Sequence, residues 1–136
     1  MKVFFDNCTS PVLATTLGGY IQHLGHEAHH IRNLPCGPNA SDIDWMNMLA
    51  QSGDTWIVIT GDGRIQRNKA ERVAFRQAAL KGFVLAPAYQ KTPLHQTAST
   101  LVWRWPEMES LTRLVAAPAL HEIPINRKAK FTALSL

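Results

Sequence analysis

Two apolar runs dominate the hydrophobic pattern of this chain. Trp56–Thr60 is aromatic or β-branched throughout, and Lys2–Phe5 is a shorter, mostly apolar run. Strands that are buried on both faces, as in a parallel sheet, have such runs because neither face needs polar residues. An acid follows each run, Asp6 directly and Asp62 after one glycine. Ligands of open α/β sheets bind at the carboxyl ends of strands, so we expect both carboxylates at one functional edge.

Helical periodicity alternates with strand signals along the chain. Ser10 and Pro11 predict a helix start, since serine caps free N–H groups and proline needs none at the first helical position. Ser41 and Asp44 form a variant of the capping box and predict a helix to Gln51. The other predicted elements are an edge strand at 28–32, a helix at 68–80, a strand at 82–86, a helix from 92 to 104 that Pro106 separates from a second one ending at 116, and a strand at 120–125. This alternation predicts a doubly wound, mostly parallel α/β sheet in the strand order 2-1-3-4, which right-handed crossovers favour.

Length and composition favour a single domain over residues 1–136. No apolar run approaches the ~20 residues of a membrane span. The N-terminus enters a strand at once and does not resemble a signal peptide, so we expect a cytoplasmic protein without membrane contact. Cys8 and Cys36 fit neither a zinc site nor a redox pair, and we expect free thiols.

The two acids at the strand ends need a counter-charge. At ~4 Å and an effective dielectric near ~20, two carboxylates repel by ~4 kcal/mol, and a divalent cation removes that cost. Oxygen ligands suit Mg²⁺ or Mn²⁺. The alternative is that Asp6 and Asp62 are helix caps or turn residues. A third carboxylate is expected in the first turn of the second helix, where we prefer Asp42 because Asp44 completes the capping box.

A basic segment follows Asp62. Residues 64–81 carry a net charge of +5, more than the +4 of the whole chain. A solvated helix face is the ordinary explanation, but cations beside a metal–acid site suit phosphodiester binding. The candidates for nucleic-acid binding are Arg64, Arg67, Lys69 and Arg72. Glu71 is either a fourth acid of the site or the ion-pair partner of Arg67 or Lys69.

Four short motifs, in this order, resemble the PIN-like domains, which include the VapC-type toxins of toxin–antitoxin pairs. They are Phe4–Asn7, Gly25-His26 before a short strand, Ser41-Asp42 at a helix start and Ile59–Asp62. The resemblance covers residues 1–86 and implies a three-layer α/β/α sandwich. It also implies an endoribonuclease that depends on Mg²⁺ or Mn²⁺ and cuts single-stranded RNA.

Carried over residue by residue, the resemblance implies that Asp6, Asp42 and Asp62 are metal ligands and catalytic residues. Thr60 supplies a catalytic hydroxyl, and with Asn7 it orients the site. Compact members often have a further acid and an aromatic residue where this chain has Gly63-Arg64-Ile65, so a fourth acid depends on Glu71. A toxin implies a cognate antitoxin as protein partner, and a homodimer stays open. The alternative is a non-catalytic module on the same fold that binds nucleic acid or protein.

Overall fold

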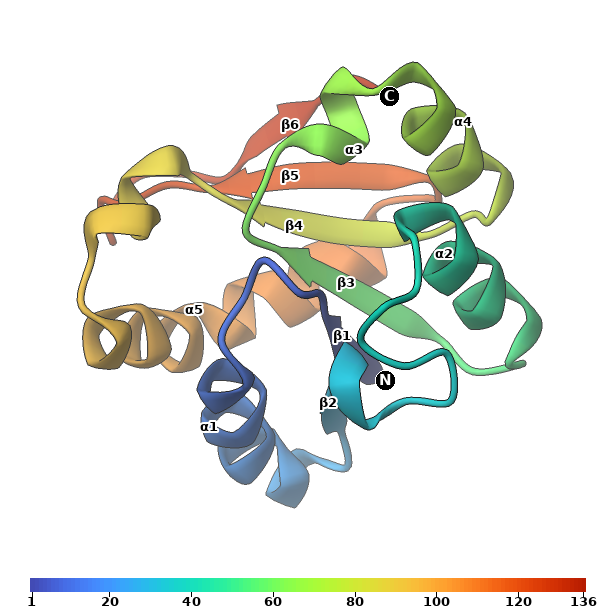
Figure 1. Cartoon of the computed structure of the whole chain (residues 1–136). Helices are drawn as coiled ribbons and strands as arrows, with labels where there is room; N and C mark the ends of the chain where they lie inside the picture. Colours follow the sequence, from blue (N-terminus) through green and yellow to red (C-terminus); the bar gives the residue numbers. More distant parts are fainter.

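A six-stranded sheet is the middle layer of the computed structural model, which describes residues 1–136 (Figure 1). Its strands lie in the order β2-β1-β3-β4-β5-β6. Their bounds are β1 Lys2–Phe5, β2 Glu27–His30, β3 Trp56–Thr60, β4 Lys81–Leu85, β5 Ala119–Ile123 and β6 Thr132–Leu134. The first five strands pair in parallel, and β6 pairs antiparallel with β5. The predicted α/β class and the order 2-1-3-4 are therefore confirmed.

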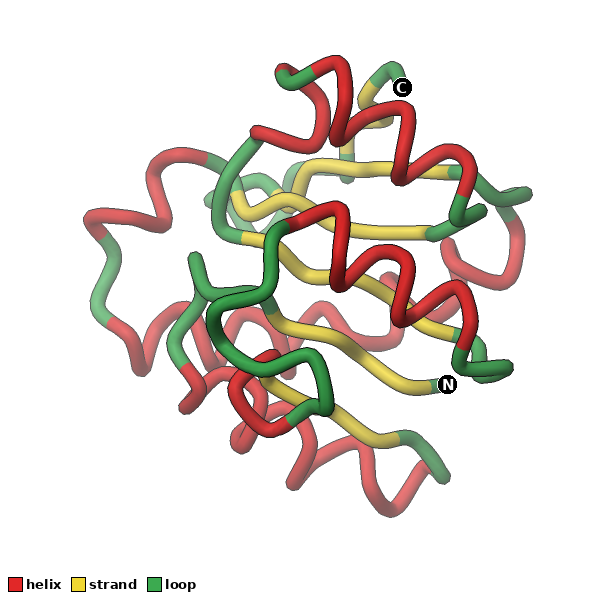
Figure 2. The backbone as a smooth tube through the Cα atoms, turned by 45° about the vertical axis from the view of Figure 1, so that its right-hand side comes forward, coloured by secondary structure: helices red, strands yellow, loops and turns green.

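Helices cover both faces of the sheet. Their bounds are α1 Pro11–Ile21, α2 Asp42–Gln51, α3 Arg64–Arg67, α4 Lys69–Gln77 and α5 Leu94–Leu114. Figure 2 shows α2 and α4 on one side of the strands and α1 and α5 on the other. Successive side chains of β1 serve the two cores alternately: Val3 and Phe5 pack with α1 and α5, while Phe4 packs with α2 and α4. The result is an α/β/α sandwich.

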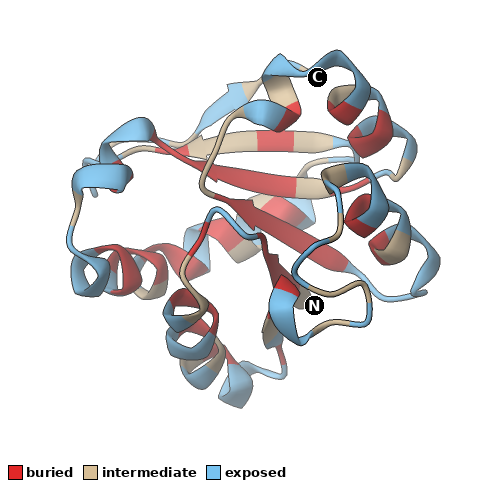
Figure 3. Ribbon diagram, viewed as in Figure 1, coloured by how far each residue is buried: buried red, intermediate tan, exposed pale blue.

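Local signals account for the ends of the elements nearest the acids. The Ser10 side chain accepts a hydrogen bond from the Val12 N–H at 3.2 Å and starts α1. The Ser41 side chain accepts one from the Asp44 N–H at 3.1 Å and starts α2. Strand β3 is buried along its whole length, as its apolar run predicts (Figure 3). These elements carry the predicted acids to the carboxyl edge of the sheet.

One prediction about the elements is wrong, and two short elements were not predicted. Helix α5 continues through Pro106, although the missing N–H and the ring should break it. Its neighbours Trp105 and Met108 are fully buried in the core, and this packing outweighs the local cost. The short helix α3 was not predicted; the carbonyl of Gly63 accepts hydrogen bonds from two N–H groups of its first turn, and Ile65 anchors it in the core. Strand β6, near the C-terminus, was not predicted either.

No helix of the structure combines the length and the apolar character that crossing a membrane requires.

Candidate active site

Four carboxylates come from four elements at the carboxyl edge of β1 and β3. Asp6 follows β1 and Asp62 follows β3, and these strands are neighbours in parallel register, with Phe5 opposite Ile59. Asp42 is the first residue of α2, and Glu71 lies in the first turn of α4. Because both helices begin at this edge, their positive ends face the same region as the strand-end acids.

Asp6 is almost completely buried, with 5% of its surface exposed. One carboxylate oxygen accepts a hydrogen bond from the Cys8 N–H at 3.1 Å, and the other accepts one from the Thr60 hydroxyl. Burial raises the pKa of Asp6 to about 6; the bonds from Thr60 and Cys8 oppose the rise, and the charges of Asp42 and Asp62 add to it. The carboxylates therefore lie close enough for their charges to interact.

Thr60 connects the first acid to the loop that carries Asp62. Its side chain is buried, and its hydroxyl donates to Asp6. The same oxygen accepts a hydrogen bond from the Asp62 N–H at 3.3 Å. A buried hydroxyl used in both directions fixes the two strand ends relative to each other.

The side chain of Asp62 is held from two sides. One oxygen accepts a hydrogen bond from the Arg64 N–H at 2.6 Å, an Asx-type turn that starts α3. The other accepts one from the Cys8 thiol at 3.2 Å. Although Cys8 is an exposed residue, partial loss of water around its thiol, followed by the charge of Asp6 and the bond to Asp62, raises the pKa of Cys8 to about 12. The thiol therefore stays protonated and is a donor, not a nucleophile.

Asp42 and Asp44 occupy different environments although both lie in the first turn of α2. Asp42 accepts a hydrogen bond from the indole N–H of Trp45 at 2.9 Å, and its charge acts on Asp6 and Glu71. The N–H of Asp44 donates to the capping side chain of Ser41. The carboxylate charge of Asp44 acts on the thiol of Cys36, away from the other acids. The structure thus brings Asp42, and not Asp44, to the strand-end acids.

Glu71 is buried, with 7% of its surface exposed. Its Oε1 lies 3.7 Å from the guanidinium of Arg64, so its ion-pair partner is neither Arg67 nor Lys69. Its Oε2 is buried without any hydrogen-bond donor. Burial first, and then contact with the Asp42 carboxylate, raises the pKa of Glu71. A buried carboxylate oxygen without a donor needs either a proton or a cation.

The carboxylates fit a hard divalent cation by their chemistry. All four offer oxygen ligands, and the free Oε2 of Glu71 has no partner in the protein. No three side chains of histidine, cysteine, aspartate or glutamate are placed so that they would hold one ion among them. Mg²⁺ commonly uses one or two carboxylates and completes its shell with water and substrate phosphate. Asp6, Asp42 and Asp62 are therefore not placed to hold one ion together, and a cation at this edge would use one or two of these predicted ligands.

The basic segment divides between the two edges of the sheet. Arg64 and Arg67 lie at the acid edge, where Arg67 lines a groove with Asp62. Lys69 is exposed at the start of α4. The half-buried Arg72 donates to the carbonyl of Gln66 at 3.0 Å, which holds α3 against α4.

The remaining two basic residues and Asn7 do not face the acids. Arg76 ends its helix near the opposite edge, where it lines a hollow with Pro118. Lys81 begins β4 and donates to the carbonyl of Thr112 at 2.7 Å. The side chain of Asn7, expected to orient the site, instead donates to the carbonyl of Pro38.

Comparison with known families gives one match. A family model described as PIN like domain matches residues 1–87. No curated protein and no solved structure matches the chain. The matched segment ends just after β4 and contains all four carboxylates described above.

Proposed function

The chain belongs to the PIN-like domain family, and on that premise we propose that it is a divalent-metal-dependent endoribonuclease acting on single-stranded RNA. The observation that carries this proposal is the convergence of Asp6, Asp42, Asp62 and Glu71 at one sheet edge, with a buried carboxylate oxygen that lacks a donor. The family supports a nuclease-type fold, and the acids supply the oxygen ligands that such chemistry uses.

The side chains of the site have distinct roles in this proposal. One or two of the carboxylates Asp6, Asp42 and Asp62 would hold a given Mg²⁺ or Mn²⁺, with water and substrate phosphate as its other ligands. When bound, the cation supplies a nucleophilic hydroxide and neutralises negative charge on the phosphate. Thr60 keeps the Asp6 carboxylate in one orientation, and the Cys8 thiol does the same for Asp62.

Cations beside the acids would bind the RNA backbone. Arg67 lines the groove next to Asp62, and Arg64 is exposed at the start of α3. Lys69 is exposed as well, whereas Arg72 is already bonded to a backbone carbonyl. We therefore assign phosphate binding mainly to Arg64, Arg67 and Lys69, with Arg72 holding the helices that present them.

Two matched pairs of variants test the catalytic assignment. Asp42→Asn should reduce cleavage of single-stranded RNA by about 100-fold or more, while Asp44→Asn should stay near wild type. Asp62→Asn should behave like Asp42→Asn, with Asp54→Asn as control because Asp54 pairs with Lys2 at 3.0 Å at the opposite edge of the sheet, where β1 and β3 begin. Cleavage is measured with Mg²⁺, with Mn²⁺ and with EDTA. Cleavage by Asp62→Asn at the wild-type rate, or in EDTA, would contradict the proposal and favour a non-catalytic binding module.

Salt dependence tests the phosphate contacts separately. On single strands each contact contributes a slope of about −0.7 to the log–log plot of affinity against salt. Arg67→Ala should flatten the slope by about one contact, and Arg76→Ala, at the opposite edge, should not change it. Equal slopes for both variants would remove Arg67 from the RNA-binding surface.

The finer part of the proposal is a toxin role. A sequence pI of 9.4 favours an acidic partner, as an antitoxin covering this edge would be. Induced expression of the wild-type protein should stop bacterial growth, and expression of Asp62→Asn should not. If both proteins are equally harmless, the ribonuclease proposal stands on its biochemical assay alone and the toxin role is withdrawn.

A homodimer is tested by the mass of the purified protein in solution.

A further inference from the structure

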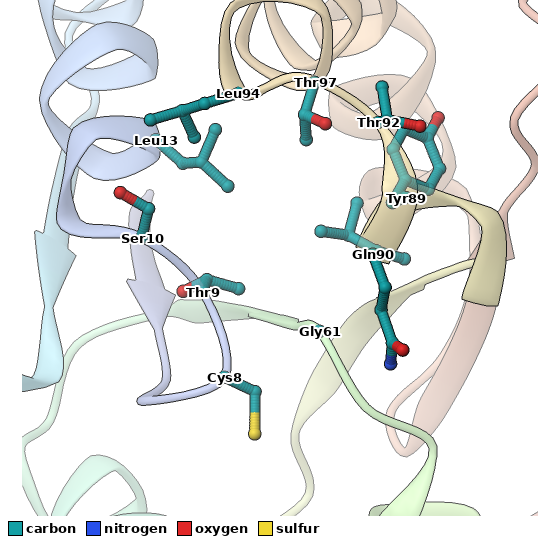
Figure 4. A pocket seen from close by; sticks show the side chains of 11 residues that line it. Cys8, Thr9, Ser10, Leu13, Gly61, Tyr89, Gln90, Thr92, Leu94 and Thr97 are labelled. Atoms are coloured by element: carbon teal, nitrogen blue, oxygen red, sulfur yellow. The ribbon is translucent and has the colours of Figure 1, made fainter.

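A pocket of about 160 Å³ opens beside the acids, on the side of the sheet that α1 and α5 cover (Figure 4). Its walls come from the loop after β1, the loop after β3, the 3₁₀ segment Pro87–Lys91 and the start of α5. Cys8 and Gly61 belong both to these walls and to the acid site, since the Cys8 thiol donates to Asp62 and Gly61 lies between Thr60 and Asp62. A ligand in the pocket would therefore lie directly next to the proposed reaction centre.

The lining of this pocket is neutral. None of its eleven residues carries a charge, although carboxylates and arginines lie close by. Such a lining does not suit a phosphate, a metal ion or a carboxylate, each of which needs a counter-charge when it leaves water. The volume is well below the ~300 Å³ at which pockets for drug-sized ligands begin. The pocket thus suits one small, uncharged group.

Free polar groups in the pocket can recognise such a group by hydrogen bonds. The hydroxyl of Thr97, a residue that is 4% exposed, has no partner among the hydrogen bonds of the protein, and Figure 4 shows it at the pocket. Gln90 also lines the pocket; it is exposed, and its amide offers both a donor and an acceptor. The Ser10 oxygen accepts from the Val12 N–H, which leaves its own hydrogen free to donate.

The rest of the lining supplies flat or apolar contact. The ring of Tyr89 is buried and held in place, because its hydroxyl donates to the carbonyl of Pro124 at 2.7 Å. Leu13 forms part of the inner wall, and Leu94 lies at the surface with 41% exposed. A fixed aromatic ring, apolar walls and both kinds of hydrogen-bonding group are the contacts that a nucleobase uses.

We propose that the pocket formed by Cys8, Ser10, Gly61, Tyr89, Gln90 and Thr97 binds one nucleobase of the RNA strand next to the phosphate that is cut. This inference rests on the proposed ribonuclease function, since it takes the base from the substrate strand. The pocket would make cleavage depend on the identity of one nucleotide.

Abasic substitution along a short RNA tests the proposal. Asp62→Asn protein is titrated with fluorescent single-stranded RNAs, each lacking one base, and the affinity is read by anisotropy. One abasic position should weaken binding by about tenfold, and the others should have much smaller effects. In proteins that also carry Gln90→Ala with Thr97→Val, this position-specific loss should disappear. The matched control is Gln77→Ala, an exposed glutamine on the far part of α4, which should keep it.

A second variant and a second probe guard against a folding defect. Leu94→Trp changes an exposed residue and should fill the opening, with the same loss of base dependence at an unchanged melting temperature. Free nucleosides should shift NMR signals of Thr97 and Gln90 in the wild-type protein, and Leu94→Trp should abolish the shifts. Shifts with free nucleosides would show that the pocket binds a base without the rest of the RNA strand.

Failure of the pocket and failure of the ribonuclease give different results. If RNA is cut in a metal-dependent way but no abasic position matters more than the others, the pocket proposal is overturned and the proposed function stands. If nucleosides bind the pocket but no variant or metal affects cleavage, the ribonuclease fails, and with it the assignment of the base to a substrate strand. A position-specific loss that survives Gln90→Ala with Thr97→Val would place the recognised base elsewhere and overturn the proposal.

Discussion

Replacing Asp6 with asparagine should make the metal-free protein more stable at about pH 8. Burial raises the pKa of Asp6 from 3.8 to about 6 in the folded protein. Because the folded state binds this proton more tightly than the unfolded chain, the group's contribution to stability is complete below pH 3.8 and is lost as the pH rises through 6. The difference between the two values corresponds to a loss of ~3 kcal/mol in the free energy of unfolding at about pH 8.

Asparagine fits the same position without leaving a buried group unpaired. Its carbonyl oxygen would accept from the Cys8 N–H as Asp6 does, and its amide would donate to the Thr60 oxygen. The Thr60 hydrogen would then turn to the carbonyl of Asp62, 3.4 Å away. We therefore expect Asp6→Asn to raise the free energy of unfolding by ~1–3 kcal/mol at about pH 8. The gain should shrink as the pH falls below about 6 and reach its minimum below 3.8, where wild-type Asp6 is protonated in both states.

Urea denaturation measures this gain. Wild type and Asp6→Asn are compared in EDTA at about pH 5 and about pH 8, and again with Mg²⁺ or Mn²⁺ at about pH 8. The cation should stabilise the wild-type protein and not the variant, since a ligand that binds only the folded state adds to its stability. An Asp6→Asn protein that is less stable than wild type at about pH 8 in EDTA would refute the reasoning. A difference that does not change with pH would refute it as well.

Three further predictions concern the surroundings of the site and the fold. Gly61→Ala should lower the free energy of unfolding by ~2 kcal/mol, because a Cβ there would lie 2.5 Å from the carbonyl oxygen of Cys8. The control is Gly63→Ala, whose Cβ would meet only the Arg67 side chain at 3.6 Å and which should melt near wild type. Iodoacetamide should label Cys8 at least ~10 times more slowly in the folded metal-free protein than in urea, although the residue is exposed, because partial desolvation and nearby carboxylates raise the pKa of its thiol to about 12. Equal rates by mass spectrometry would contradict this. Pro106→Ala should raise the free energy of unfolding by ~1–3 kcal/mol, since the interior of α5 regains an N–H donor and loses a ring clash; a lower value in urea would mean that contacts of the ring outweigh both.

Short-range patterns predicted the part of the fold that presents the acids. Strands β1 and β3 have the predicted bounds because buried parallel strands leave a continuous apolar run in the sequence. The caps Ser10 and Ser41 act on N–H groups two or three residues away, so their effect is local. The strand order followed from handedness. Asp6 and Asp62 accordingly lie at neighbouring strand ends.

Tertiary contacts decided what the sequence could not predict. The two halves of α5 stay together across Pro106 because burial of Trp105 favours one continuous helix. The net charge of the basic segment does not predict where its side chains point. In the fold, Lys81 contacts the end of α5, while Arg64 pairs with Glu71. The hydrogen bond from Cys8 to Asp62 joins residues 54 positions apart, and no spacing rule predicts it.

The contact between Gly61 and the Cys8 carbonyl fixes the position of the acids relative to the neighbouring pocket. The loops after β1 and β3 meet there without room for a methyl group, and the thiol bond to Asp62 joins them a second time. Neither loop can shift without the other, so the distance from the acids to the neighbouring pocket is constant. In a strand that occupies both, the bond that breaks would lie at a set number of nucleotides from the base that is read. Cleavage products would then share one terminal nucleotide on the same side of every cut.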